Sequence, residues 1–165
     1  MATDAIVLLK SDHKDVKALF RRFQKKGTSD AAKGQLVAKI IELLTVHTYI
    51  ENECMYPEVR KLLPDVEDDI LESYEEHHVA DVLIVELNSM TPDDERFEAK
   101  TTVLIENVSH HIEEEEQEWF PKVREGLSRS QLQDLGARML EMKKTAPRKP
   151  TEPKALRKAL DAIRA

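Results

Sequence analysis

Apolar residues recur at steps of three and four along most of this chain, and polar residues separate them. Such spacing places the apolar side chains on one face of an α-helix, so it predicts helices with one buried side. Four long helices and a shorter fifth are expected, at about residues 3–26, 36–57, 65–87, 91–121 and 130–144. Short links between long helices favour antiparallel neighbours. The predicted fold class is therefore all-α, an up-down antiparallel four-helix bundle with an extra short C-terminal helix.

The expected helix ends carry recognisable signals. Thr3 and Asp4 are suited to cap the first helix, and Gly27 to end it. The acids after Pro64 are expected to open the third helix. The stretch 91–94 combines a capping residue, a proline and two acids, so we expect it to open the fourth.

A set of chemically distinctive residues occurs twice in the chain, 64 positions apart. The apolar frame repeats at the same offset, for example at Ile41 and Ile105. A fixed period indicates a duplicated structural unit. The two copies together supply six candidate metal ligands, which suits two metal ions sharing bridging carboxylates inside a helical bundle. The first copy holds His13, His47, Glu51 and Pro57, and the second holds His77, His111, Glu115 and Pro121.

The pair His47 and Glu51, four residues apart, would lie on one helix face and reach a common centre. One His-x-x-x-Glu pair is weak evidence, because such pairs are usually surface hydrogen bonds. Two pairs at a matched offset, each beginning ten residues before a proline, are far more specific. A purely structural bundle would have to bury these groups without partners, at a cost of several kcal/mol.

Several neighbouring residues require a choice. His77 keeps the 34-residue spacing that separates His13 from His47, so His77 is preferred to His78, and His111 to His110. His78 and His110 are then expected behind the ligands or at the surface. Cys54 shares the helix face of His47 and Glu51; a small buried thiol is favoured over a redox role or an occasional metal contact. Tyr74 should point inward. Within the acidic run 113–118 only Glu115 lies on the helix face of the other candidate ligands, so we expect Glu113, Glu114, Glu116 and Glu118 to form a solvated face.

Four imidazoles and two carboxylates form a borderline-hard ligand set that needs no thiolate. Structural zinc usually takes four ligands, often sulfur, whereas calcium and magnesium prefer oxygen. Iron therefore fits best, with manganese as the alternative. Burial behind apolar residues would admit only something small, such as dioxygen, peroxide or nitric oxide.

Size, composition and charge bound the remaining possibilities. The 165 residues are enough for one domain with a real core, and 35% of them are charged, with four glycines. No apolar run approaches about 18 residues, so no membrane contact is expected. The single cysteine excludes an internal disulfide framework and favours a cytoplasmic location. The net charge of −7 argues against nucleic-acid binding by the main body.

The C-terminal end differs from the rest of the chain in charge and composition. Residues 143–165 hold eight Lys or Arg against two acids, with three prolines. We expect a bundle over residues 1–127, an extra helix packed on it over 128–144, and a basic tail over 145–165. The tail should contain a short amphipathic helix with Leu156, Leu160 and Ile163 on one side. A loosely docked end is favoured over electrostatic contact with the acidic body or with an acidic partner.

At its candidate ligands the chain resembles the hemerythrin family, in the bacterial form called the HHE cation-binding domain. The segments SDHKDVKALF, HTYIENECMYP, YEEHHVADVLIVEL and HHIEEEEQEWFP resemble that family's four ligand-bearing helices in order, over about residues 3–127. The resemblance implies a non-haem di-iron centre with an oxo or hydroxo bridge. It assigns the four histidines as terminal ligands and the two glutamates as bridges.

One departure from the family pattern bears on function. The oxygen-carrying members have a fifth histidine one turn after the third-helix histidine, and here that position is Asp81. Asp81, His78, a tyrosine or water could take the place. The change weakens the case for a plain reversible oxygen carrier and leaves open a more reactive centre.

Two classes of function follow. The first is a di-iron protein that binds or reacts with dioxygen, peroxide or nitric oxide; whether it is an enzyme, for example one that disproportionates peroxide, is left open. The second is an iron- or oxygen-sensing module without turnover, whose fold depends on its metal. Iron storage is less favoured, because nothing indicates a shell-forming oligomer.

Overall fold

The computed structural model describes residues 3–164, with side chains described up to residue 161. All regular structure in this part of the chain is helical, which confirms the predicted all-α class. Four long helices dominate: α1 (Ala5–Gln24), α2 (Asp30–Ile50), α4 (Glu67–Asn88) and α5 (Phe97–Glu114). The shorter elements are α3 (Tyr56–Leu62), α6 (Phe120–Gly126), α7 (Arg129–Thr145), α8 (Pro153–Arg164), two π-helical turns (Glu51–Met55 and Glu115–Trp119) and a 3-10 turn (Pro64–Val66).

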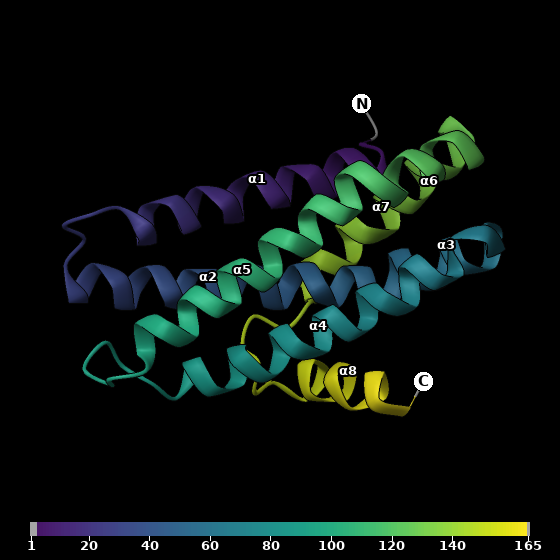
Figure 1. Ribbon diagram of the computed structural model, residues 1–165. Helices are drawn as coiled ribbons and strands as arrows, with labels where there is room; N and C mark the ends of the chain where they lie inside the picture. Colours follow the sequence, from purple (N-terminus) through teal and green to yellow (C-terminus); the bar gives the residue numbers. More distant parts are fainter. Residues whose placement is uncertain (1–2, 165) are drawn as a thin grey trace.

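The long helices form an antiparallel bundle (Figure 1). The α1–α2 and α4–α5 connections lie together at one end, and the connection from α3 to α4 lies at the other. The predicted up-down four-helix bundle is therefore confirmed. α7 crosses beside α1, and α8 runs along the outside of α4.

Two of the three helix starts behave as the sequence predicts. The Asp4 carboxylate accepts a hydrogen bond from the Val7 N–H at 2.9 Å and caps α1. A 3-10 turn beginning at Pro64 leads into α4. The expected start at residues 91–94 is wrong, because α5 begins only at Phe97. The Asp94 carboxylate accepts from the Thr91 N–H at 2.7 Å, and this local bond holds a turn in place of a first helical turn.

The two ligand-bearing helices α2 and α5 each change pitch at the same point of the repeat. Each becomes π-helical at its glutamate, Glu51 or Glu115, and returns to α-helix before its proline. The Tyr56 N–H bonds to the Glu51 carbonyl and the Phe120 N–H to the Glu115 carbonyl, both five residues back. A proline lacks the N–H that would continue the α-helical ladder, so one wide turn precedes it.

The hydrophobic core consists of two clusters stacked along the bundle axis. One, at the end bearing α3, α6 and α7, contains Leu9, Ile50, Ile70 and Trp119. The other, toward the α1–α2 connection, contains Val16, Leu44, Ala80 and Val108. On α1, α2 and α4, and on α5 together with the π-helical turn that continues it, a predicted histidine ligand falls between a residue of the first cluster and a residue of the second. The candidate ligands therefore form a polar layer between two dry ones.

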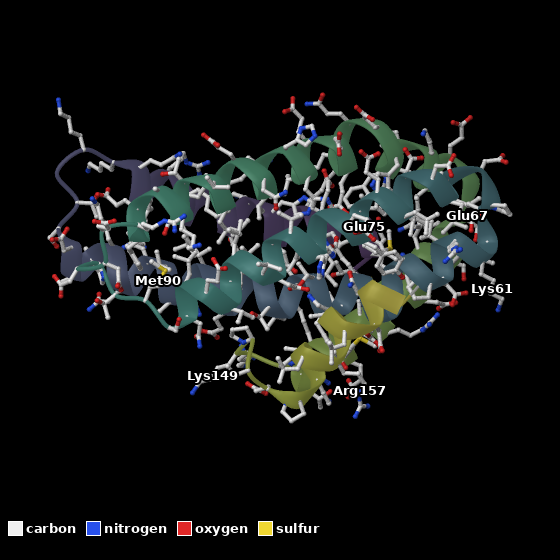
Figure 2. The ribbon with its side chains drawn as sticks, turned by 60° about the horizontal axis from the view of Figure 1, so that its bottom comes forward. Lys61, Glu67, Glu75, Met90, Lys149 and Arg157 are labelled. Atoms are coloured by element: carbon white, nitrogen blue, oxygen red, sulfur yellow. The ribbon has the colours of Figure 1, made fainter. Side chains whose placement is uncertain are left out.

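The basic C-terminal region contacts the acidic body of the protein. Lys143 pairs with Asp12 at 2.5 Å, and Arg148 with Glu42 at 3.0 Å. The structure therefore shows the alternative expectation, electrostatic contact between the C-terminal region and the acidic body. The favoured expectation of a loosely docked end is wrong. Lys149 and Arg157 point away from the bundle (Figure 2). Among the described helices, none is long and apolar enough to span a bilayer.

α8 packs against the bundle through the side that carries Lys158, and not through the apolar side that its sequence pattern predicts. Lys158 is buried, with 4% exposure, and Ala155 is buried beside it. Leu156 and Leu160 are 45% and 54% exposed, so the apolar stripe of this helix faces outward. The side chain of Ile163, the third residue expected in that stripe, lies outside the described residues.

Candidate metal centre

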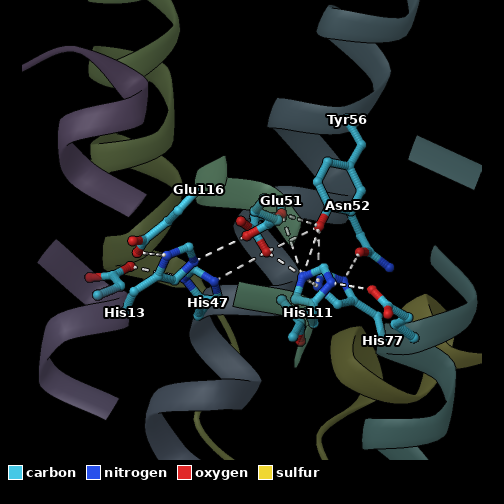
Figure 3. A network of polar contacts seen from close by, with 12 residues as sticks. His13, His47, Glu51, Asn52, Tyr56, His77, His111 and Glu116 are labelled. Carbon is cyan, nitrogen blue, oxygen red and sulfur yellow. Dashed lines mark hydrogen bonds and ion pairs between the residues drawn. The ribbon is translucent and has the colours of Figure 1, made fainter. Parts of the chain in front are cut away.

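All six side chains predicted as ligands meet in the polar layer of the bundle (Figure 3). Both carboxylates are completely buried, and the four imidazoles are at most 7% exposed. They form two groups whose ligand atoms lie within 4.8 Å of one another, and Glu51 belongs to both. The first group is His13, His47, Glu51 and Glu115, and the second is Glu51, His77 and His111.

Each carboxylate approaches histidines of both groups. The Glu51 Oε2 atom lies 3.2 Å from Nε2 of His47 and 3.2 Å from Nε2 of His77. Glu115 lies 3.1 Å from Nε2 of His13 and 3.4 Å from Nε2 of His111. This is the arrangement that two bridging carboxylates between two cations would require.

Four buried polar atoms at this point have no hydrogen-bond partner among the described residues. They are Nε2 of His13 and of His47, Oε1 of Glu51 and Oε2 of Glu115. Leaving such atoms unpaired in a low-dielectric interior costs about 1–3 kcal/mol each. A bound cation would satisfy all four, so the residues present fit a metal centre.

In each of the four imidazoles, the ring nitrogen Nδ1 lies beside a polar side chain from outside the ligand set. Nδ1 of His13 lies 2.8 Å from Glu116, and Nδ1 of His77 lies 2.5 Å from Asn52. Nδ1 of His47 lies 3.3 Å from Asp12, and Nδ1 of His111 lies 2.6 Å from Glu76. An acceptor at Nδ1 fixes the tautomer that leaves the Nε2 lone pair free for a metal.

Sequence reasoning missed these four partners, although the repeat contains them. Asp12 and Glu76 are 64 positions apart and each precedes a histidine; Asn52 and Glu116 are also 64 apart and each follows a glutamate. The same offset that identified the ligands would have identified their partners. The expectation that Glu116 belongs to a solvated face is therefore wrong.

Tyr56 breaks the symmetry of the two halves. Its hydroxyl donates to Glu115 Oε1 at 2.8 Å and lies 3.2 Å from Nε2 of His77. The equivalent residue 64 positions later is Phe120, which stacks on the His13 ring at 5.9 Å. Among the four candidate histidines, the phenol therefore lies within hydrogen-bond distance of His77 and His111 only.

The buried ionisable groups perturb one another strongly. Burial and the charge of Glu115 raise the pKa of Glu51 well above its usual value. Burial alone would also raise the pKa of Glu115, but the charges of His111 and His13 outweigh it and lower that pKa to about 2. Burial, followed by the charge of His111, lowers the pKa of His77 well below its usual value. Without a metal the cluster thus favours a neutral His77, an ionised Glu115 and a protonated Glu51, so a cation that binds Glu51 must displace its proton.

The remaining candidate residues fall outside the ligand groups. His110 is 64% exposed and lies 2.9 Å from Glu114, and His78 is partly buried, as expected for residues behind the ligands or at the surface. Cys54 is a free, buried thiol. The Tyr74 hydroxyl donates to the Asn52 carbonyl at 3.4 Å. The Asp81 carboxylate accepts from Lys158 Nζ at 2.8 Å, so in this structure it is turned toward α8.

This antiparallel bundle, with buried histidines and glutamates converging at its middle, defines a helical-bundle protein with a cluster suited to cations. The chain belongs to the hemerythrin HHE cation-binding domain family, whose profile matches residues 4–123. The earlier resemblance is thereby confirmed.

Two known proteins are similar to this chain. A solved hemerythrin HHE cation-binding domain-containing protein of Mycobacterium kansasii shares the fold, with a TM-score of 0.70 and 19% identity over 97% of this chain and 99% of that one. A Nostoc protein described as a DNA nickase is 30% identical over 125 residues. That match covers 75% of this chain but only 34% of the Nostoc protein, so the chain spans about a third of that relative.

Proposed function

We propose that this protein holds two iron ions and binds or reacts with a small oxygen or nitrogen molecule, such as dioxygen, peroxide or nitric oxide. The observation that carries the proposal is the convergence of six buried side chains that can ligate a metal. Four of their polar atoms have no hydrogen-bond partner among the described residues. Glu51 and Glu115 would bridge the ions. His13 and His47 would hold one ion, and His77 and His111 the other.

The donor set supports iron over other common metals. It contains imidazole and carboxylate but no thiolate, because Cys54 lies outside both groups. Structural zinc usually takes four ligands, and calcium or magnesium would not favour four imidazoles. Manganese remains the alternative that the same donors would accept.

When bound, a pair of adjacent irons supplies two-electron chemistry toward a small oxygen or nitrogen molecule. The protein's own residues do the rest. The outer carboxylates and Asn52 orient the imidazoles, and the two apolar clusters exclude bulk water. The Tyr56 phenol offers a hydrogen-bond donor beside His77, at the end of the cluster that lacks a fifth histidine.

Metal analysis of protein purified without added metal, followed by anaerobic titration with ferrous iron, tests the proposal. We expect two irons per chain. The iron-loaded protein should change its near-ultraviolet and visible absorption when mixed with nitric oxide, oxygen or peroxide. Glu51→Ala and Glu115→Ala should each lose the paired stoichiometry, whereas Glu118→Ala, an exposed residue of the same acidic run, should keep it. A stoichiometry of one, a preference for zinc, or a spectrum unmoved by all three reagents would refute the proposal.

A second candidate function is an iron- or oxygen-responsive module without turnover. Two hydrogen bonds favour it: Lys158 of α8 donates to Thr48, the residue after His47, and to Asp81, one turn after His77. The docked tail thus contacts residues that are close in sequence to two candidate ligands. Comparing tryptic cleavage of the tail with and without iron separates the two functions. Identical cleavage patterns would show that iron does not change the docking of the tail, and would contradict the responsive module.

A further inference from the structure

Two neighbouring cavities lie beside histidines of the candidate centre. The outer one, about 290 Å³, lies between α1, α2 and α7. The inner one, about 10 Å³, lies inside the bundle against His47, His77 and His111. The two cavities share three lining residues, Val16, Leu44 and His47. The side chains of these residues therefore lie between the outer cavity and the inner one.

One wall of the outer cavity belongs to a part of the chain that the family profile does not cover. That profile ends at residue 123, whereas Lys143, Lys144 and Arg148 line the cavity. The side chains of Lys144 and Arg148 are 68% and 60% exposed, so this wall opens to solvent. Asp12, which also lines the cavity, accepts from both Lys143 and His47. The opening thus lies directly outside a candidate ligand.

The inner cavity is small, and Asn107 gives it an unused polar atom besides those of the candidate ligands. Its volume corresponds to about one water-sized molecule. Val16, Leu44, Ala80, Val108 and Ile112 make most of its wall apolar. The Asn107 Oδ1 atom, on the same wall, is buried without a hydrogen-bond partner among the described residues.

We propose that the outer cavity is the access route to the metal centre for an uncharged molecule of one or two heavy atoms, with Val16 and Leu44 as its gate. The molecule passes between these two side chains into the inner cavity. There the Asn107 carbonyl oxygen accepts a hydrogen bond from a ligand that carries an O–H group. An ion would lose its hydration in the apolar inner cavity, so the gate selects by charge as well as by size. This inference rests on the proposed function only in that the metal gives the route its destination.

The first experiment needs no metal. Dissolved oxygen is paramagnetic and speeds the relaxation of methyl protons that it approaches. In the metal-free full chain under raised oxygen pressure, the methyl groups of Val16, Leu44 and Val108 should relax faster than those of Ile6 and Leu9. The latter two are also buried, but in the other core cluster. Equal relaxation of the two sets would overturn the route.

The second experiment changes the gate in the iron-loaded protein. The rate of nitric oxide association, measured by stopped-flow absorption, should fall about tenfold from Val16→Ala to Val16→Ile, a barrier change of about 1.4 kcal/mol. Val37→Ala and Val37→Ile are matched controls, because Val37 is equally buried in the same cluster and lines neither cavity. The control rates should agree within about twofold. Equal rates in the two Val16 variants would overturn the gate.

A third variant separates ligands with and without an O–H donor. Asn107→Leu should slow the reaction with hydrogen peroxide and leave nitric oxide association unchanged. An unchanged peroxide rate would overturn the role of Asn107. If the iron-loaded wild-type protein responds to none of nitric oxide, oxygen and peroxide, the proposed function fails, while the methyl relaxation still decides whether the route exists.

Discussion

Tyr56 and Phe120 show how a single residue differentiates two otherwise matched halves. They occupy equivalent positions of the repeat, yet only Tyr56 supplies a hydroxyl, which donates to Glu115 at 2.8 Å. Burial and the charges of Glu115 and Glu51 raise the pKa of Tyr56 well above its usual value, so the metal-free protein keeps it as a neutral donor. The two candidate metal positions are therefore chemically unequal.

Tyr56→Phe should destabilise the metal-free protein. It leaves a buried acceptor on Glu115 without its donor, at a cost of about 1–3 kcal/mol. Urea unfolding of the metal-free protein measures the loss. Tyr49→Phe, at a partly buried position at the edge of the same cluster, serves as the control and should cost less. Equal losses in the two variants would contradict the role of the Glu115 bond.

Glu116 gives a residue-scale test of the outer partners. Removing its carboxylate in Glu116→Ala frees Nδ1 of His13, so the imidazole is no longer held in the metal-binding tautomer. We expect iron affinity to fall about 10–100-fold, as measured by competition with a chelator. Glu118→Ala, two residues later and exposed, should bind iron as the wild type does. Equal affinities in both variants would rule out an orienting role for Glu116.

Cys54 should be chemically quiet at neutral pH. Burial raises the pKa of its thiol, and only the thiolate is reactive. Because the raised pKa keeps the proton on sulfur, alkylation by iodoacetamide in the folded protein should be slow near pH 7 and accelerate only in alkaline solution. Urea should abolish the protection. Mass spectrometry follows the modification, and equal rates in folded and unfolded protein at pH 7 would show that the thiol is accessible.

At the scale of elements, the helices could be predicted from local spacing, and the six ligand candidates from local spacing together with the 64-residue repeat. His47 and Glu51 are one turn apart, and a 3.6-residue period fixes their face without knowledge of the fold. Whether these residues ligate a metal stays a prediction. The π-helical turns could not be predicted with the same ease, since proline allows several local responses. The late start of α5 at Phe97 depends on one side-chain bond from Asp94, which overrides the preference of the stretch 91–94.

The contact between α7 and the start of α1 depends on the absence of a side chain. A Cβ atom at Gly136 would lie 2.1 Å from the Thr3 carbonyl oxygen and 2.9 Å from the Ala5 nitrogen. Alanine normally favours a helix over glycine by about 1 kcal/mol. Here Gly136→Ala should instead destabilise the protein by about 1–3 kcal/mol, because the backbone of one element must move.

Thermal unfolding of Gly136→Ala and of Asp134→Ala tests this contact. Asp134 is exposed on the same helix, so its replacement should be neutral or slightly stabilising. A Gly136→Ala protein as stable as the wild type would show that α7 does not press on the start of α1.

At the scale of the whole molecule, the chain consists of a duplicated bundle closed by a basic C-terminal region. The bundle halves follow from the repeat. The docking of α8 does not, because Lys158 meets Thr48 and Asp81, which are 110 and 77 positions away in the sequence. Helical periodicity predicted the amphipathic helix but could not show that its charged side would face the body.

Lys158→Met tests whether this one buried lysine holds the tail. The substitution keeps most of the aliphatic stem but leaves the Asp81 carboxylate, 13% exposed, without its cation. Breaking a buried pair in this way costs up to about 3–5 kcal/mol, and burial alone already raises the pKa of Asp81. Because α8 makes its buried contacts through Lys158 and Ala155, it should detach before the bundle unfolds. Hydrogen exchange in α8 and tryptic cleavage at Arg157 should both speed up, while the amides of α1 and α5 stay protected.

The double variant Lys158→Met with Asp81→Asn should recover part of the protection, because it removes the uncompensated charge. If α8 exchanges in the single variant as slowly as in the wild type, the apolar contacts of the tail and not its lysine hold it in place.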